Sequence, residues 1–360
     1  MSIALILGTR PEIIKMSPVI RELNRKQANF FILHTGQHYS YNLDKVFFEQ
    51  LDLPQPRYNL DVGSGSHATE TSKMLVGIEK VLLEEKPEVV LVQGDTNSVL
   101  AGALAASKLA IKVGHIEAGL RSYDRTMPEE INRILTDHCA DLLFAPTEKA
   151  EKILLGEGIP ADKIFVTGNT IVDAVYQNRA IAREKGNILD TLKLKAGEYF
   201  VVTLHRQENV DDKARFASVL DGLDQVATKF ETPLIYPMHP RARKMMTQFG
   251  LHPQHIRLIE PLDFLGFLHL ESNARLIFTD SGGIQEETCI LNVPCVTLRD
   301  NTERPETLDV GANILAGASP QRIVECATLM LGREPHWHNP FGDGTAGSKI
   351  VKITIGDSND

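Results

Sequence analysis

The chain alternates short, uninterrupted apolar runs with longer amphipathic segments over most of its 360 residues. In the first half the apolar runs are Ile3–Leu7, Phe30–Leu33, Val89–Val92, Val113–Ile116, Leu142–Ala145 and Ile164–Val166. In the second half they are Tyr199–Leu204, Leu234–Pro237, Ile256–Ile259, Leu276–Phe278 and Cys295–Leu298. Continuous apolar character in a short strand indicates burial on both faces, which is typical of parallel sheets covered by helices.

The segments between these runs have helical amphipathic patterns, clearest in Pro11–Arg25, Ala68–Glu85, Ser98–Lys108, Asp212–Lys229, Phe264–Glu271 and Ile284–Leu291. Strands that alternate with helices predict parallel βαβ units. The alternation pauses over residues 170–198, so we place a domain boundary there. We therefore expect two doubly wound, Rossmann-like α/β domains, residues 1–170 and 171–339, that face each other across a cleft. The tail, about residues 340–360, is a candidate to pack back on the first domain.

Charge and cysteine usage exclude several classes of partner. The formal net charge of −9 repels nucleic acid and anionic membranes. No apolar run approaches the roughly 20 residues of a membrane-spanning helix, and the apolar start of the chain has no basic leader. The cysteines form no CxxC pair and are typical of buried thiols in a reducing compartment: Cys139, Cys289, Cys295 and Cys326. We expect a cytoplasmic protein that binds neither nucleic acid nor membrane.

Polar side chains concentrate where the predicted strands end. In open parallel sheets, ligands bind beyond the carboxyl ends of the strands. Six such ends carry chemically capable residues: Gly8-Thr9-Arg10-Pro11-Glu12, Gln93-Gly94-Asp95-Thr96-Asn97, Glu117-Ala118-Gly119-Leu120-Arg121, His205-Arg206-Gln207-Glu208-Asn209, Met238-His239-Pro240-Arg241 and Thr279-Asp280-Ser281-Gly282-Gly283. Single residues such as Asp95 or Ser281 also suit ordinary helix N-caps. The whole set is more than capping requires, and it predicts a functional site.

The Ser281-Gly282-Gly283 turn is a candidate phosphate site, because it joins a strand to a helix. Backbone N–H groups at a helix N-terminus attract oxyanions, and glycine lets the backbone approach closely. A merely flexible loop is the alternative. If the ligand carries a diphosphate, cations and a histidine from other strand ends could also contact it: Arg10, Lys15, His205 and Arg304. Glu287, one turn into the helix, could accept hydrogen bonds from ribose hydroxyls, or be an ordinary surface carboxylate.

Several cofactor and metal signatures are absent from the sequence. No GxGxxG follows the first strand, and the chain has neither a Walker loop nor an HExxH motif. Asp137-His138-Cys139 is the only local trio of metal-ligand types, and neighbours on a helix point apart, so packing is the better interpretation. We predict no metal and no nicotinamide cofactor.

The candidate acid–base groups are Asp95, Glu117 and the pair Glu129-Glu130. Pro128 suits the first helical position, which places Glu129 in the first turn. Glu129 is expected to face the cleft, with Glu130 about 100° away around the helix. A surface carboxylate that compensates the helix dipole is the alternative for Glu129. Several carboxylates close together resist joint ionisation, which can separate a base from an acid.

Seven blocks of the chain, in order, resemble non-hydrolysing UDP-N-acetylglucosamine 2-epimerases. They are Gly8-Thr9-Arg10-Pro11-Glu12, Gln93-Gly94-Asp95-Thr96, His115-Ile116-Glu117-Ala118-Gly119-Leu120-Arg121, Pro128-Glu129-Glu130-Ile131-Asn132-Arg133, Thr203-Leu204-His205-Arg206-Gln207-Glu208-Asn209, Asp280-Ser281-Gly282-Gly283-Ile284-Gln285-Glu286-Glu287 and Thr302-Glu303-Arg304-Pro305-Glu306. The tail Asn339-Pro340-Phe341-Gly342-Asp343-Gly344 also fits.

The resemblance implies a glycosyltransferase-B type fold, a homodimer and the interconversion of UDP-GlcNAc and UDP-ManNAc. In that reaction, loss of the proton from carbon 2 is coupled to departure of UDP from carbon 1. This elimination leaves a 2-acetamidoglucal intermediate, to which UDP adds back after protonation from the other face. Groups that stabilise the diphosphate therefore assist departure as well as binding.

The resemblance also implies roles for individual residues. Asp95, Glu117 and Glu129 are the acid–base carboxylates, and His205 joins the catalytic set through the diphosphate. Phe267 lies near the uracil, and Glu287 lies at the ribose. Two departures stand out. Leu262 follows Pro261 where some members have Gln, and the loop around Gln37 and His38, where many bacterial members bind an activating second substrate, differs in Tyr39-Ser40-Tyr41-Asn42.

Three alternatives stay open at this point. Relatives act on 2,3-diacetamido-uronic acid or 6-deoxy amino sugars linked to UDP, so the sugar is less constrained than the reaction. A glycosyltransferase of the same fold would release UDP only with an acceptor. A silent nucleotide-sugar sensor would bind without turnover.

Overall fold

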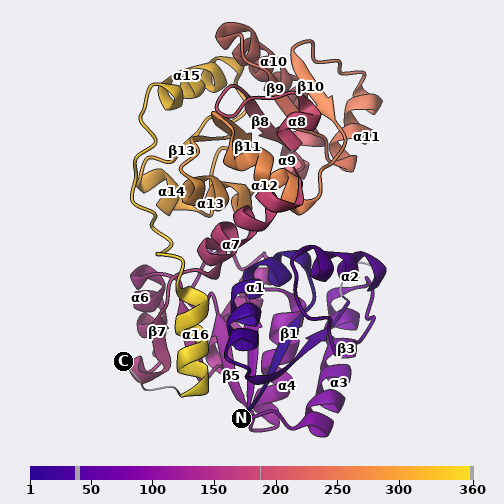
Figure 1. Ribbon diagram of the computed structural model, residues 1–360, viewed down its shortest axis with the longest axis vertical. Helices are drawn as coiled ribbons and strands as arrows, with labels where there is room; N and C mark the ends of the chain where they lie inside the picture. Colours follow the sequence, from indigo (N-terminus) through magenta and orange to yellow (C-terminus); the bar gives the residue numbers. More distant parts are fainter. Residues whose placement is uncertain (37–40, 187, 357–360) are drawn as a thin grey trace. The chain divides into compact units, whose positions relative to one another are not determined.

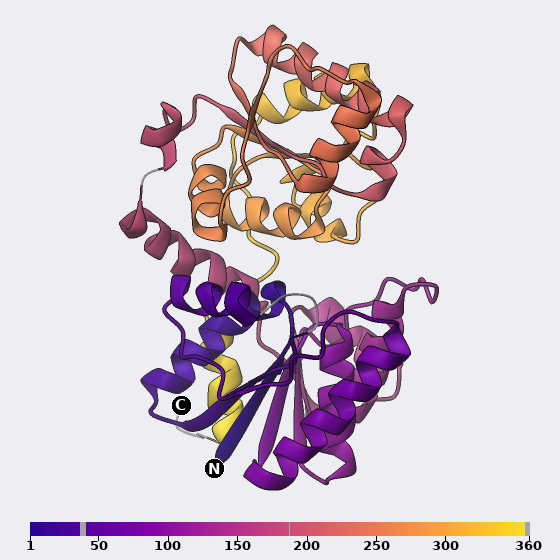
Figure 2. The ribbon, with the colours of Figure 1, turned by 90° about the vertical axis from the view of Figure 1, so that its right-hand side faces the viewer.

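The computed structural model describes residues 1–36, 41–186 and 188–356 (Figures 1 and 2). The chain divides into two compact units. Unit 1 consists of Met1–Tyr176 and Phe341–Asp360, and unit 2 consists of Gln177–Pro340. The division falls inside helix α7 (Thr170–Lys185), whereas the sequence places the boundary after residue 170. None of the described helices has the length and apolar character needed to cross a membrane.

The described strands of unit 1 form one parallel sheet in the order β3-β2-β1-β4-β5-β6-β7. Their bounds are β1 (Ser2–Leu7), β2 (Asn29–His34), β3 (Tyr58–Asn59), β4 (Val89–Gln93), β5 (Lys112–Ile116), β6 (Leu142–Ala145) and β7 (Ile164–Val166). Strand β1 lies between β2 and β4, with Ile3 opposite Phe30 on one side and Val89 on the other. Ile3 to Leu7 are fully buried, as the uninterrupted apolar run predicts.

Helices cover both faces of this sheet (Figure 2). Besides α7, they are α1 (Arg10–Arg25), α2 (Tyr41–Gln50), α3 (His67–Glu85), α4 (Asn97–Lys108), α5 (Pro128–Cys139), α6 (Glu148–Gly156), the 3-10 helix η1 (Ala161–Lys163) and α16 (Ala346–Ile355). Thr96 and Thr147 begin α4 and α6 as N-caps whose hydroxyls accept from Val99 N and Ala150 N. Each cap starts a helix directly beyond a strand, and this brings the residues between strand and helix to the carboxyl edge.

Unit 2 contains a second parallel sheet, whose described strands run in the order β10-β9-β8-β11-β12-β13. They are β8 (Phe200–Thr203), β9 (Leu234–Pro237), β10 (Ile256–Ile259), β11 (Leu276–Thr279), β12 (Cys295–Thr297) and β13 (Asn313–Leu315). The helices are α8 (Ile188–Leu192), α9 (Gln207–Val210), α10 (Lys213–Phe230), α11 (Pro240–Phe249), α12 (Phe264–Ser272), α13 (Gly282–Leu291), α14 (Pro305–Asp309) and α15 (Pro320–Leu331). They too lie on both faces of their sheet (Figure 2).

The predicted fold class, two parallel-sheet α/β domains, is confirmed. Two short strands were not predicted, namely β3 and β13. Both lie at the edge of their sheet, where one side of the strand has no neighbour and a continuous apolar run is not needed. Asn313 of β13 instead uses its side chain in hydrogen bonds with Thr297 and Thr307.

The C-terminal tail returns to unit 1, where α16 packs against α1 (Figure 1). Gly347 permits the close approach, because a Cβ there would lie 3.0 Å from Pro18 Cβ. Asp173 of α7 is buried and accepts hydrogen bonds from Ala346 N (3.2 Å) and Gly347 N (2.9 Å) at the start of α16. The first and last parts of the chain thus share one unit.

Candidate active site

Glu117 stands directly after β5 and is the most elaborately held carboxylate of unit 1. It is buried, and its backbone φ of +71° lies in the left-handed region, which residues other than glycine rarely adopt. Lys15 Nζ and Asn169 Nδ2 donate to Oε1 at 2.5 and 3.1 Å, and Gln93 Nε2 donates to Oε2 at 2.5 Å. A strained backbone held by three donors from separate elements is typical of a site whose geometry has a function. The structure thus brings the predicted residues Lys15 and Glu117 together.

A buried ion network supports the turn that follows β5. Asp137 pairs with His115 Nδ1 (2.6 Å) and Arg121 Nη1 (2.7 Å), and also accepts from Gly119 N (3.2 Å). His115 Nε2 lies 2.8 Å from Gly94 O, so both ring nitrogens are within hydrogen-bond distance of an oxygen. Burial alone would raise the pKa of Asp137, but His115 and Arg121 outweigh it and lower that pKa. The sequence predicts only helix packing for Asp137, and the structure assigns it this ion network instead.

Asp95 and the two acids of α5 have different surroundings. Arg133 Nη2 lies 2.5 Å from Asp95 Oδ2, and Asn132 Nδ2 donates to Asp95 O at 2.9 Å. The Asp95 side chain keeps 31% of its surface exposed. Glu129 is exposed in the first turn, whereas Glu130 is buried and pairs with Arg133 at 2.9 Å. The two glutamates therefore point to different sides of the helix, as the geometry of α5 predicts.

The turn from β1 to α1 holds a further buried acid, Glu12. Its Oε2 accepts from Gly8 N (2.6 Å) and Thr9 N (2.7 Å), and its Oε1 accepts from the Thr96 hydroxyl. Burial raises the pKa of Glu12 to about 7, although these donors act in the opposite direction. Glu12 therefore links the ends of β1 and β4.

Arg10 and Lys15, both predicted to bind phosphate, begin the same helix but have different neighbours. The Arg10 guanidinium carbon lies over the Phe47 ring, 5.9 Å from its centroid. Lys15 is one turn further along and contacts Glu117. Gln37 and His38, the predicted activator loop, lie outside the described residues.

In unit 2, His205 follows β8 and is oriented by a buried aspartate. His205 Nδ1 lies 3.2 Å from Asp280 Oδ1, and Asp280 Oδ2 also accepts from Arg206 N (3.0 Å) and Asn209 Nδ2 (3.2 Å). Burial alone would raise the pKa of Asp280, but these hydrogen bonds, with His205 first, lower it. The His205 side chain remains 41% exposed while Asp280 is fully buried. The buried carboxylate of Asp280 thus orients the ring through Nδ1, while part of the ring remains exposed.

A cavity of ≈ 280 Å³ lies at the carboxyl ends of β8, β9 and β11. It brings together three predicted residues from separate elements, His205, Phe267 and Ser281. Leu262 also lines it, so the position where some relatives have Gln presents an apolar side chain here. The other lining residues are Thr203, Leu204, Pro237, His239, Pro240, Pro261 and Ile284.

Ser281 is the N-cap of α13, and Gly282 and Gly283 form its first turn. Ser281 N donates to Thr279 Oγ1 at 2.9 Å, which ties the turn to β11. Unfilled space surrounds both glycines, because an added Cβ would come no closer than 3.8 Å to Glu303 or Ser281. The helix N-terminus therefore presents its backbone at the cavity that Ser281 lines.

The last two predicted residues interact with acids of unit 2. Arg304 Nε forms a 2.8 Å ion pair with Glu286 Oε1, which is almost fully buried. Glu287 is half-buried on α13, and its charge adds to burial in raising the pKa of the buried Glu271 well above its ordinary value. No cluster of His, Cys, Asp and Glu among the described residues could hold a metal ion.

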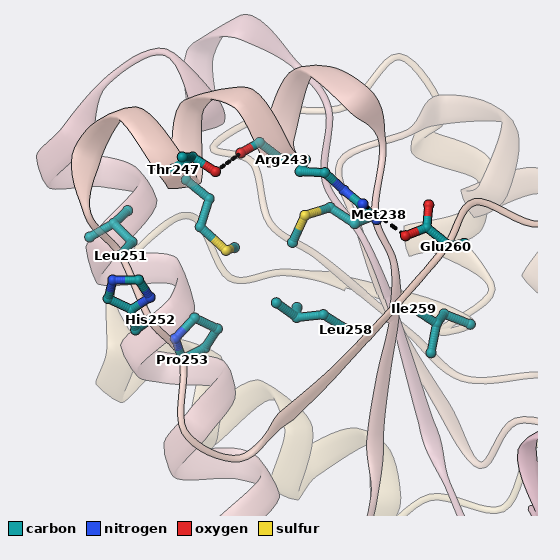
Figure 3. A pocket seen from close by; sticks show the side chains of 10 residues that line it. Met238, Arg243, Thr247, Leu251, His252, Pro253, Leu258, Ile259 and Glu260 are labelled. Carbon is teal, nitrogen blue, oxygen red and sulfur yellow. Dashed lines mark hydrogen bonds and ion pairs between the residues drawn. The ribbon is translucent and has the colours of Figure 1, made fainter.

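A larger cavity of unit 2, ≈ 740 Å³, holds none of the predicted residues (Figure 3). Met238, Leu251 and Leu258 contribute much of its apolar lining, and Arg243 and Glu260 pair at one end at 2.8 Å. The acid in its lining, Glu260, is the one paired with Arg243. Chemistry rather than size therefore identifies the candidate site.

Sequence reasoning missed the supporting residues. Asn169 lies 52 positions from Glu117, and no local pattern predicts their contact. Glu271 belongs to an apolar helical segment that carries no motif. Glu12 had an available signal, because Thr9 and Glu12 have the spacing of a capping box.

Comparisons with known proteins cover almost the whole chain. Residues 21–355 match the family model described as UDP-N-acetylglucosamine 2-epimerase. The chain is 58% identical to the UDP-N-acetylglucosamine 2-epimerase of Methanococcus maripaludis, over 99% of this chain and 98% of that protein. It is 42% identical to the UDP-2,3-diacetamido-2,3-dideoxy-D-glucuronate 2-epimerase of Pseudomonas aeruginosa, over 98% and 99%.

Among solved structures, the chain is similar to the Methanocaldococcus jannaschii UDP-GlcNAc 2-epimerase crystallised with UDP-GlcNAc and UDP. The two share 55% identity and a TM-score of 0.87, with 99% of each chain covered.

Proposed function

Because the chain belongs to the UDP-N-acetylglucosamine 2-epimerase family, and so to the isomerases, we propose that it interconverts UDP-GlcNAc and UDP-ManNAc. The observation that carries the proposal is the strained, buried Glu117 carboxylate at the end of β5. It stands in the same unit as the accessible acids Asp95 and Glu129. Epimerisation needs a base on one face of carbon 2 and an acid on the other, and this unit supplies several carboxylates.

The proposed reaction proceeds by elimination and re-addition. One carboxylate removes the proton from carbon 2 while the bond from carbon 1 to the UDP oxygen breaks, which leaves a double bond between the two carbons. A second carboxylate then protonates carbon 2 from the opposite face, and UDP re-forms its bond to carbon 1. Asp95, Glu117 and Glu129 are the proposed acid–base groups. No metal, nicotinamide or other cofactor has a step in this scheme.

The nucleotide is proposed to bind to unit 2, with the uracil near Phe267 and the ribose near Glu287. Ser281, Gly282 and Gly283 at the start of α13 are the proposed diphosphate donors. His205, Arg10, Lys15 and Arg304 supply further charge-assisted contacts to the diphosphate and so stabilise the departing UDP. The cavity that joins His205, Phe267 and Ser281 supports this assignment.

Incubation of the purified protein with UDP-GlcNAc in D2O tests the reaction. We expect deuterium at carbon 2 and the appearance of UDP-ManNAc, both followed by proton NMR without any acceptor. Binding of UDP-GlcNAc with neither exchange nor a new epimer would identify a sensor. UDP release that requires an acceptor would identify a glycosyltransferase.

The choice of sugar is tested with a panel of UDP-amino sugars. The panel should include UDP-2,3-diacetamido-2,3-dideoxy-D-glucuronate as the alternative substrate, because the relative from Pseudomonas aeruginosa named for it is 42% identical to this chain. The greater identity to the Methanococcus maripaludis enzyme favours UDP-GlcNAc. A higher kcat/KM for the uronate would reverse this choice.

His205→Ala tests the diphosphate contact. Loss of a charge-assisted hydrogen bond should weaken the binding of UDP by about tenfold. Isothermal titration with UDP and with uridine separates the contacts, because uridine lacks the phosphates and should bind equally to both proteins. Unchanged UDP affinity would remove His205 from the phosphate site.

We also propose that the protein acts in the cytoplasm as a homodimer and supplies ManNAc units for cell-surface polysaccharide. The family resemblance supports the dimer, and the four free cysteines support a reducing compartment. Analytical ultracentrifugation over a range of concentrations tests the assembly, and a monomer at the concentration of full activity would contradict it.

A further inference from the structure

Asn169 stands between β7 and α7, and its side chain reaches the Glu117 carboxylate across the edge of the sheet. Asn169 is buried, and its Nδ2 donates to Glu117 Oε1 at 3.1 Å. Glu117 follows β5 and Asn169 follows β7, with β6 between these strands in the sheet. Neighbouring strands lie about 4.8 Å apart, so the contact bridges the carboxyl ends of two strands that are about 10 Å apart.

The Asn169 amide is held at both of its ends. Its Oδ1 accepts from Ile171 N at 3.1 Å, at the start of α7. The Ile171 N–H requires an acceptor and the Glu117 carboxylate requires a donor, so only one orientation of the amide satisfies both. A short side chain that is held in this way can in turn fix the position of the oxygen to which it donates.

The C-terminal tail holds the backbone of the same residue. Asn169 N donates to Phe341 O at 2.8 Å, and the Phe341 side chain is buried. Gly342 comes next, with a φ of +117°, and an added Cβ there would lie 3.2 Å from Gly168 Cα. The two backbones are therefore packed directly against each other. Both belong to unit 1, although they lie far apart in the sequence.

We propose that the tail is part of the catalytic apparatus of unit 1: Phe341 fixes the backbone of Asn169, and Asn169 is a positioning residue that holds the Glu117 carboxylate in the orientation needed for proton transfer. The inference rests on the proposed function, in which Glu117 transfers a proton at carbon 2. Lys15 supplies a charge to the same oxygen on a long, flexible stem, so the geometry depends on Asn169. Geometry matters because a displacement of about 1 Å can cost about 10²-fold in rate.

Two variants separate this function from simple capping of α7. Serine is as suitable as asparagine directly before a helix, so Asn169→Ser keeps an acceptor for Ile171 N, but its hydroxyl ends one bond short of Glu117. Asn169→Asp keeps the size and the acceptor, but places a second carboxylate where Glu117 needs a donor. We expect kcat, measured as deuterium incorporation at carbon 2, to fall by about tenfold in Asn169→Ser and further in Asn169→Asp.

UDP affinity distinguishes a displaced carboxylate from a damaged fold. Asn169 is not among the proposed nucleotide contacts, so both variants should bind UDP within about twofold of the unmodified protein in isothermal titration. Asn273→Ser is the matched control, because Asn273 ends α12 in unit 2, and it should keep kcat. A normal kcat in both Asn169 variants overturns the inference, and so does a loss of UDP affinity as large as the loss of kcat.

A double-mutant cycle tests whether Asn169 acts through Glu117. In the Glu117→Gln background, Asn169→Ser should change the remaining rate by less than about twofold, because its target is already absent. A further fall of about tenfold would show an independent effect and overturn the inference. If Glu117→Gln alone keeps a near-normal rate, the proposed function of Glu117 fails and the inference falls with it. If Glu117→Gln is slow and both Asn169 variants are normal, only the inference is overturned.

The contribution of the tail is tested at Gly342. Gly342→Ala adds a Cβ against Gly168 and should move Phe341 O away from Asn169, which we expect to lower kcat by about threefold to tenfold. Gly356→Ala is the control, because Gly356 lies in the same tail with a φ of +68° but its added Cβ meets nothing within 4 Å, and it should keep kcat. A folded Gly342→Ala with a normal kcat overturns the contribution of the tail. If Gly342→Ala fails to fold in urea denaturation, the Asn169 variants still decide the inference.

Discussion

Glu117 and Glu12 show that two buried acids at one sheet edge can have different properties. Glu117 has a cation, Lys15, at 2.5 Å, together with amide donors. Glu12 is held by two backbone N–H groups and a hydroxyl, and burial raises its pKa to about 7. The neighbours of each acid, rather than its burial alone, determine the chemistry available to it.

Replacing the proposed proton-transfer groups should remove most of the activity. Glu117→Gln and Asp95→Asn remove the carboxylates, and each should lower kcat by about 10²-fold or more. The rate is measured as deuterium incorporation at carbon 2. Glu148→Gln is a matched control, because Glu148 is exposed in the first turn of α6, and should be unaffected. A near-normal rate in either test variant would remove that residue from the proton transfer.

Glu12 should make stability depend on pH. Its pKa rises from 4.5 in the unfolded chain to about 7 in the folded protein, so folding takes up a proton between these values. Its contribution is complete below about pH 4.5 and is lost as pH rises to about 7, by about 3 kcal/mol in total.

Glu12→Gln cannot titrate, and its amide can still accept from Gly8 N and donate to Thr96. The unfolding free energy of the unmodified protein should therefore fall relative to that of Glu12→Gln between pH 4.5 and 8. Urea denaturation at both values measures this difference. An equal difference at the two pH values would show that Glu12 does not titrate in this range.

At the scale of single residues, the sequence predicts the groups that face a ligand better than the groups that hold them. Glu117, Asp95 and His205 follow apolar runs, and this position alone made them candidates. Asn169 and Asp280 act through contacts that cross 52 and 75 positions of the chain. Such contacts depend on how strands are ordered in the sheet, which a local pattern does not contain.

At the scale of elements, each central strand of the two described sheets is predicted, and so are the edge strands β7 and β10. Runs such as Leu142–Ala145 and Leu234–Pro237 coincide with observed strands, because central parallel strands are apolar on both faces. The edge strands β3 and β13 have two and three residues and were missed. A glycine directly after a central strand can be required for another reason, because neighbouring side chains leave no room for a Cβ.

Gly8 joins β1 to α1 where no side chain fits. An added Cβ would lie 2.1 Å from Thr35 Oγ1 and 2.2 Å from Ser98 Oγ, which are hydrogen-bonded to each other at 2.7 Å. Gly8→Ala should therefore lower the unfolding free energy by about 1–3 kcal/mol through overpacking. Urea denaturation measures the change. Gly156→Ala is the control, because an added Cβ at Gly156 meets nothing within 4 Å, and it should not destabilise. Equal stability of the two variants would contradict the packing argument.

At the scale of the whole molecule, unit 1 is completed by a segment remote in sequence. Helix α16 packs on α1, and Asp173 accepts two backbone N–H groups at the start of α16. The sequence made the tail only a candidate for this role, since polar, Pro- and Gly-containing segments carry little periodicity.

Asp173→Ala should loosen that attachment. Two buried N–H groups would lose their acceptor, which costs about 2 kcal/mol or more of unfolding free energy. Urea denaturation and the rate of proteolysis within residues 341–356 provide the measurements. Asp343→Ala is a control, because Asp343 is exposed and its partners, Thr345 and Lys349, lie within the tail itself. Proteolysis no faster in Asp173→Ala than in Asp343→Ala would show that Asp173 does not hold the tail.

The two-part composition of unit 1 has a consequence for biosynthesis. Unit 2 is one continuous stretch inserted between the two parts of unit 1. The ribosome therefore releases all of unit 2 before it releases α16, the partner that α1 requires. The portion translated first completes its packing last, and until then the surface of α1 that α16 will cover is open to solvent and to chaperones.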